Sequence, residues 1–113
     1  MQISILIGQV PVTWDVDANL ETLRDVVDQA QSGDVIVLPE GMLSGYGEDL
    51  TPLEAVDRAL IDNAVAQVAA LAVQRQVHIF CGSLLPWQGG WCNAGLIFTA
   101  PATTTYTGRS ISP

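Results

Sequence analysis

The stretch that decides the fold is DVIVLPEGMLSGY, residues 34–46. It opens with the continuous apolar run Val35 to Leu38, which is typical of a central parallel strand buried on both faces. Pro39 ends this run, because proline lacks the backbone N–H that a sheet ladder needs. Glu40 follows at once, so a carboxylate is predicted at the carboxyl end of an inner strand, where open α/β sheets bind ligands. The competing interpretation is a strand-end glutamate that points to solvent or caps the next turn.

Two helices are predicted on either side of this stretch. Residues 18–31 place leucines and valines at helical spacing, with Asp17 or Asn19 as the cap and Ser32-Gly33 as the end. After a glycine-rich loop, residues 53–76 again repeat apolar side chains at helical spacing. The second of these helices therefore spans several turns and has one apolar face.

Strand patterns fill the rest of the chain. The predicted strands are residues 2–10, 34–38, 77–85 and 91–99, and another that begins at 103. Strands that alternate with helices imply parallel pairing. The turn cluster at residues 86–90 predicts an antiparallel hairpin instead, and Pro101-Ala102 predicts a second turn. The sequence therefore predicts an α/β fold with a mixed sheet.

Composition excludes several classes of function. The formal net charge is −8, and the four cations are all arginines, scattered along the chain. Nucleic acid and anionic membranes are excluded as partners, because binding them needs clustered cations. No apolar run approaches the ~20 residues of a membrane span, and the start has no basic segment typical of a signal peptide. The cytoplasm is the default location. Two cysteines and one histidine favour neither a metal site nor a cofactor.

The motif around Glu40 resembles a known catalytic motif. Leu38-Pro39-Glu40 followed by Ser44-Gly45-Tyr46 resembles the first catalytic motif of the nitrilase superfamily of carbon–nitrogen hydrolases. The flanking segments resemble the family in the same order, as far as Tyr106. They are residues 7–12, Asn19-Leu20, residues 55–76, residues 78–83 and residues 91–95. The chain is thus similar to the amino-terminal half of that family.

The resemblance implies a fold and a chemistry. The fold is half of an αββα sandwich, a mixed sheet with two helices on one face. The chemistry is hydrolysis of an amide or nitrile by a Glu–Lys–Cys triad, in which Glu40 matches the general base. Such a route needs a thiolate, a base that generates it and a cation at the developing oxyanion. The resemblance identifies no substrate-binding residue.

The other two members of the triad have no match. The lysine position falls near Gly108, where Arg109 is the only nearby cation, and a guanidinium differs from an ammonium in reach and geometry. The chain ends at Pro113, before the family's nucleophile segment. We therefore expect a partial hydrolase domain over residues 1–106 and a divergent tail over residues 107–113.

The two cysteines and Asn93 receive structural interpretations. Cys81 and Cys92 lie in apolar strands, where cysteine behaves as a small hydrophobe rather than a nucleophile. Asn93 is expected to form hydrogen bonds within the sheet.

Two functional hypotheses remain. The first is a carbon–nitrogen hydrolase represented by its first half and inactive alone. The second is a non-catalytic remnant or oligomerisation module. In both cases one sheet face lacks a cover, so we expect self-association.

Overall fold

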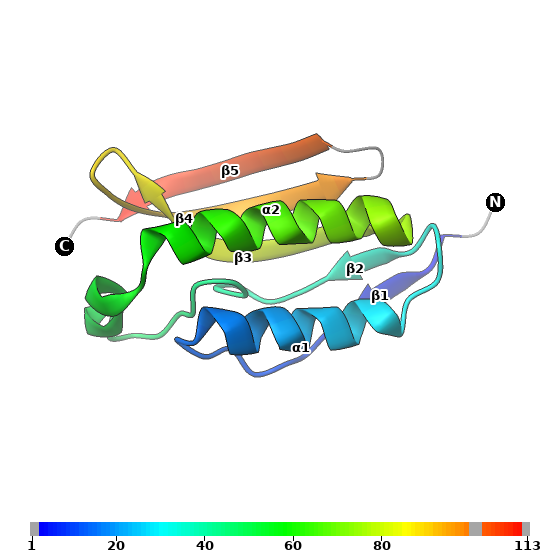
Figure 1. The fold of residues 1–113 in the computed structure, drawn as a ribbon, viewed down its shortest axis with the longest axis horizontal. Coiled ribbons are helices and arrows are strands. Elements are labelled where there is room, and N and C mark those ends of the chain that lie inside the picture. Colours follow the sequence, from blue (N-terminus) through cyan, green and yellow to red (C-terminus); the bar gives the residue numbers. More distant parts are fainter. Residues whose placement is uncertain (1–2, 100–102, 112–113) are drawn as a thin grey trace.

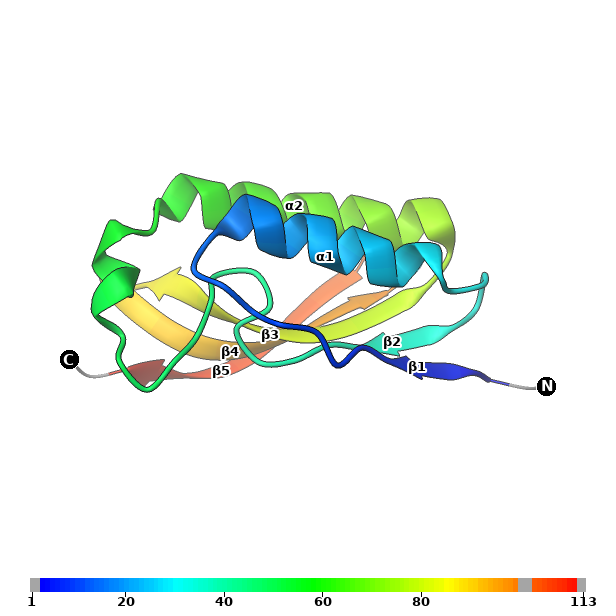
Figure 2. The same ribbon diagram turned by 90° about the horizontal axis from the view of Figure 1, so that it is seen from below.

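The computed structural model describes residues 3–99 and 103–111. Within these residues the chain forms one five-stranded mixed sheet with two α-helices on one face (Figures 1 and 2). The elements are β1 (Ile5–Ile7), α1 (Val16–Asp28), β2 (Val35–Val37), the 3-10 helix η1 (Thr51–Ala55), α2 (Arg58–Arg75), β3 (His78–Trp87), β4 (Gly90–Thr99) and β5 (Thr103–Ile111). The predicted α/β fold class is confirmed.

The sheet joins a parallel half to an antiparallel half. Its strand order is β1-β2-β3-β4-β5, with β1, β2 and β3 parallel and β3, β4 and β5 antiparallel. The hairpin turn consists of Gln88 and Gly89, which both have positive φ, as a two-residue type I′ turn requires. Pro86 and Trp87, expected in the turn, therefore belong to β3. The predicted turn at Pro101-Ala102 lies outside the described residues.

Helix α1 begins earlier than the sequence predicts, and its cap is a different residue. The Asp15 carboxylate accepts a hydrogen bond from the Ala18 N–H at 3.1 Å, so Asp15 is the N-cap. The prediction of Asp17 or Asn19 as the cap was wrong. The helix also ends at Asp28, before the predicted stop at Ser32-Gly33.

The predicted helix over residues 53–76 is wrong at its start. Residues 51–55 form the short η1 instead, and Val56 is extended. Helix α2 begins at Arg58, because the Asp57 carboxylate accepts a hydrogen bond from the Ala59 N–H at 2.9 Å. The capping hydrogen bond of Asp57 thus sets the start of α2, although the apolar periodicity in the sequence begins before this residue.

The core lies between the helices and one face of the sheet, seen edge-on in Figure 2. Fully buried side chains on that face include Ile36, Ile79 and Phe98. They pack against α1 and α2, which are joined by an ion pair between Arg75 and Asp28. No helix within the described residues is long and apolar enough to cross a membrane.

No helix within residues 3–99 and 103–111 covers the opposite face of the sheet (Figure 2). Ile7, Val37, Phe80 and Ile97 pair in register across four strands, so their side chains share this face. Ile7 is 65% exposed and Phe80 is 40% exposed. We call this surface the open face.

Candidate active site

Glu40 lies in a bulge between β2 and β3. The Pro39 carbonyl accepts a hydrogen bond from the Gly82 N–H at 3.2 Å, and the Met42 N–H donates to the Gly82 carbonyl at 2.8 Å. Glu40 and Gly41 protrude between these two hydrogen bonds, in the turn that follows the end of β2, and we call this pair the Glu40 bulge. A Cβ at position 82 would lie 2.9 Å from the Glu40 Cα, so the bulge needs glycine in β3.

The loop that follows Glu40 is fixed by buried polar groups. The buried Ser44 hydroxyl accepts a hydrogen bond from the Leu84 N–H at 2.9 Å and donates to the Gly45 carbonyl at 2.8 Å. The buried Asn19 amide donates to the Leu43 carbonyl at 3.2 Å. Asn19 is therefore a brace between α1 and this loop, which holds Glu40 on a rigid base.

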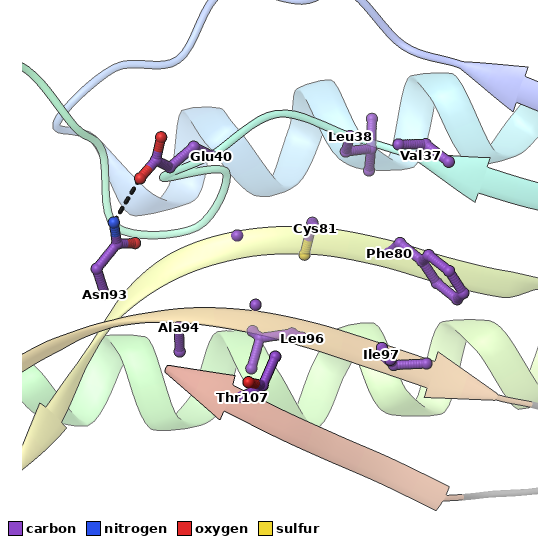
Figure 3. Close-up of a pocket in the computed structure, with 12 residues that line it drawn as sticks. Val37, Leu38, Glu40, Phe80, Cys81, Asn93, Ala94, Leu96, Ile97 and Thr107 are labelled. Atoms are coloured by element: carbon purple, nitrogen blue, oxygen red, sulfur yellow. Dashed lines mark hydrogen bonds between the residues drawn. The ribbon is translucent and has the colours of Figure 1, made fainter. Parts of the chain in front are cut away.

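The Glu40 side chain extends toward β4 (Figure 3). Its Oε1 accepts a hydrogen bond from Nδ2 of Asn93. The strand pattern predicts hydrogen bonds of Asn93 within the sheet, but this bond reaches a loop residue 53 positions away. The sequence carries a weak signal for it, a lone amide among apolar and small residues of β4.

A pocket of about 420 Å³ opens beside Glu40 on the open face. Its lining includes Glu40, Phe80, Gly82, Asn93, Gly95 and Thr107 (Figure 3). Gly82 and Gly95 are direct partners in the β3–β4 ladder, so the sheet has no side chains at that point. The hollow results from this glycine pair, and the carboxylate at its edge can reach a small bound molecule.

Both cysteines are buried. Within the described residues, the hydrogen bond to the Glu40 carboxylate comes from Asn93 and not from either thiol. Cys81 pairs with Leu96 in the ladder and belongs to the core beneath the helices. Burial raises the pKa of the Cys81 thiol to about 12, so the reactive thiolate is disfavoured. The described residues hold no group of three or more histidine, cysteine, aspartate or glutamate residues suited to a metal ion.

Three of the four arginines are engaged away from Glu40. Arg24 binds Gln67, Arg75 binds Asp28, and Arg58 donates to the carbonyls of the β3–β4 turn while stacking on Trp91. Arg109 occupies the β5 position that pairs with Asn93. Gly108, near the expected lysine position, pairs with Ala94. The backbone of residues 107–111 thus continues the sheet, whereas the boundary at residue 106 stays a prediction about sequence divergence.

Comparison with known families decides the assignment. The family model for carbon–nitrogen hydrolase matches residues 1–110. The chain belongs to the carbon–nitrogen hydrolase family. The resemblance of the Glu40 motif and its flanks to the nitrilase superfamily is thereby confirmed.

Individual proteins that are similar to this chain agree with the family assignment. The protein named "Hydrolase in pqqF 5'region" of Pseudomonas protegens is 35% identical over 72 residues, which are 64% of this chain and 25% of that protein. A CN-hydrolase superfamily protein from Xanthomonas campestris has a TM-score of 0.74 at 20% identity, over 96% of this chain and 40% of its own. An amidase from Nesterenkonia sp. has a TM-score of 0.74 at 14% identity, over 98% and 44%. The chain thus spans less than half of each of these proteins.

Proposed function

We propose that this chain is the amino-terminal part of an amidase-type carbon–nitrogen hydrolase and that Glu40 is its general base. The observation that carries the proposal is the Glu40 carboxylate, restrained beside a pocket at the carboxyl end of β2. A carboxylate at such a point can accept a proton from a thiol that attacks an acyl carbon. It can then pass that proton to the departing ammonia and accept another from the water that releases the acyl group.

We infer that the 113 residues do not catalyse this reaction alone. A tetrahedral intermediate needs a cation or a set of donors at its oxyanion. The chain has no lysine, and the described arginine side chains are engaged elsewhere. Neither cysteine is placed as a nucleophile, because both are buried.

Small aliphatic amides are the proposed substrate class. In support, the amidase from Nesterenkonia sp. has been solved in complex with butyramide. The pocket beside Glu40 is small, and its walls mix apolar side chains with one carboxylate, one amide and the Thr107 hydroxyl. Nitriles are the second class to test.

Ammonia release from a panel of small amides and nitriles tests the proposal. The chain should release none by itself. A longer protein, expressed with any reading frame that continues beyond codon 113, should release ammonia if that frame supplies a lysine and a cysteine nucleophile.

Two glutamine variants provide the matched comparison in the longer protein. Glu40→Gln should abolish turnover, whereas Glu48→Gln should retain it, because Glu48 is an exposed glutamate beyond the same loop. Full activity of Glu40→Gln would refute the general-base role. Turnover by the chain alone that disappears in Glu40→Gln would refute its incompleteness and implicate Arg109 as the missing cation.

A non-catalytic packing module is the second candidate, and the open face favours it. Ile3, Ile5 and Ile7 are each about two-thirds exposed, at 64–65%. Exposed apolar surface of this kind marks an interface.

A further inference from the structure

We propose that Asn93 is a positioning residue, which holds the Glu40 carboxylate in one orientation across the pocket. The inference rests on the proposed role of Glu40 as the base. It gives β4 a role in the proposed site, although β4 lies outside the Glu40 motif.

The chemistry of the pair suits this role. The Asn93 amide donates to Oε1 of Glu40 and leaves Oε2 available to accept a proton. Glu40 is exposed, and a glutamate side chain free in water samples many rotamers, which a positioned base must give up. A hydrogen bond from a neutral amide restricts these rotamers without placing a second charge beside the carboxylate.

Both partners are fixed to the same strand. Glu40 is held by the two hydrogen bonds that Gly82 makes on either side of the bulge. Asn93 pairs with Leu84, two residues further along β3, and the Leu84 N–H binds Ser44 of the Glu40 loop. The distance between the carboxylate and the amide is therefore set by β3 rather than by flexible segments.

Strand β5 supports Asn93 from the other side. A Cβ at Gly108 would lie 2.8 Å from the Asn93 carbonyl oxygen, so glycine allows β5 to approach the backbone there. The amide side chain thus projects from an inner strand with a neighbour on each side.

Magic-angle-spinning NMR tests the proposal on the chain itself, whether soluble or assembled. With ¹³C in glutamate carboxyls and ¹⁵N in asparagine side chains, dipolar dephasing should show one close pair. This dephasing should be lost in Asn93→Ala and retained in Asn63→Ala, because Asn63 is exposed on α2. Absence of dephasing in the wild-type chain would overturn the proposal.

A reciprocal swap separates positioning from a merely structural role. The isosteric Asn93→Asp removes the donor, so the Glu40 side-chain order parameter should fall into the flexible range, below about 0.6. The double variant Glu40→Gln with Asn93→Asp exchanges donor and acceptor and should restore the restraint. An unchanged order parameter in the single variant, or no recovery in the double variant, would refute positioning.

A third variant tests the same proposal in case Asn93→Asp does not fold. Glu40→Ala changes only an exposed loop side chain, and it should mobilise the Asn93 amide. An Asn93 amide that stays rigid would contradict the proposal. None of these measurements needs turnover, so their failure removes Asn93 from the site, whereas a failed hydrolysis assay removes the proposed function.

Discussion

The two faces of the sheet differ in what covers them, although the same five strands build both. On the helix-covered face Ile36, Ile79 and Phe98 are fully buried. On the open face Ile7 and Phe80, which pair in register through Val37, remain largely exposed. The covered face therefore stabilises the fold, while the open face contributes little until something packs on it.

The proposed site lies on one of these two faces. The glycine pair Gly82 and Gly95, the Glu40 bulge and Asn93 all belong to the open-face pocket, whereas Cys81 belongs to the covered face. The covered face is filled to exclude water, and the open face keeps a hollow with a carboxylate at its edge. One sheet thus separates folding from the proposed reaction.

The two phenylalanines of the chain test the comparison most severely. Phe98→Ala should cost about 3–5 kcal/mol of unfolding free energy, because it leaves a cavity in a packed core. Phe80→Ala should cost less than about half of that, because its ring is 40% exposed. Urea unfolding at dilute concentration measures both. Equal losses would show that the open face is already covered.

Self-association tests the open face directly. The chain should form dimers or larger species, and the double variant Ile5→Thr with Ile7→Thr should weaken them roughly thirtyfold or more, for about 2 kcal/mol of lost apolar burial. Leu60→Thr is the control, because Leu60 is an exposed apolar residue on α2. Analytical ultracentrifugation measures the three proteins. A monomeric wild-type chain would contradict this packing argument.

The Glu40 bulge predicts a smaller, local effect. Gly82→Ala should cost about 1–3 kcal/mol, because the new methyl group would meet the Glu40 Cα at 2.9 Å. Gly90→Ala in the same hairpin is the matched control, since a Cβ there meets its nearest atom at an ordinary 3.7 Å. Thermal unfolding compares the two variants. Identical melting temperatures would argue against the tight passage of Glu40 over Gly82.

Cys81 should show the smallest effect near neutral pH. Its pKa is raised by burial from 9.0 to about 12, so the folded chain keeps a proton that the unfolded chain loses. The associated stability is fully present below pH 9 and declines as the pH rises from 9 toward 12. Urea unfolding at pH 8 and pH 10 should show a steeper decline for the wild-type chain than for Cys81→Ala. Rapid alkylation of folded Cys81 at pH 8 would contradict its burial.

Local patterns predicted much of this fold from the sequence. The apolar run Val35 to Leu38, the hairpin and the two helices all appear where a period or a turn signal places them. One error concerns burial, because β2 was expected to be buried on both faces and Val35 and Val37 are only half-buried. The other errors lie at element ends. Asp15 and Asp57 set the starts of the helices through single capping hydrogen bonds, and apolar periodicity does not register such bonds.

The site was predicted only in part, for a physical reason. Glu40 was proposed because the motif around it is continuous in sequence, and its side chain lines the pocket. The contribution of Asn93 depends on a ladder that brings residues 53 positions apart into contact. The need for glycine at position 82 likewise appears only when the bulge crosses β3. Both are properties of strand register, which sequence pattern alone left open.

The split between parallel and antiparallel halves has a consequence during synthesis. Strands β3, β4 and β5 pair with their neighbours in sequence, so they can assemble as soon as they are made. Strand β2 needs β3 on its other side, yet 40 residues separate Val37 from its partner's start at His78. At about 5–20 residues per second, the ribosome delays that partner by roughly 2–8 s. Throughout this interval the apolar strand before Glu40 lacks the hydrogen-bonding partner that β3 later provides.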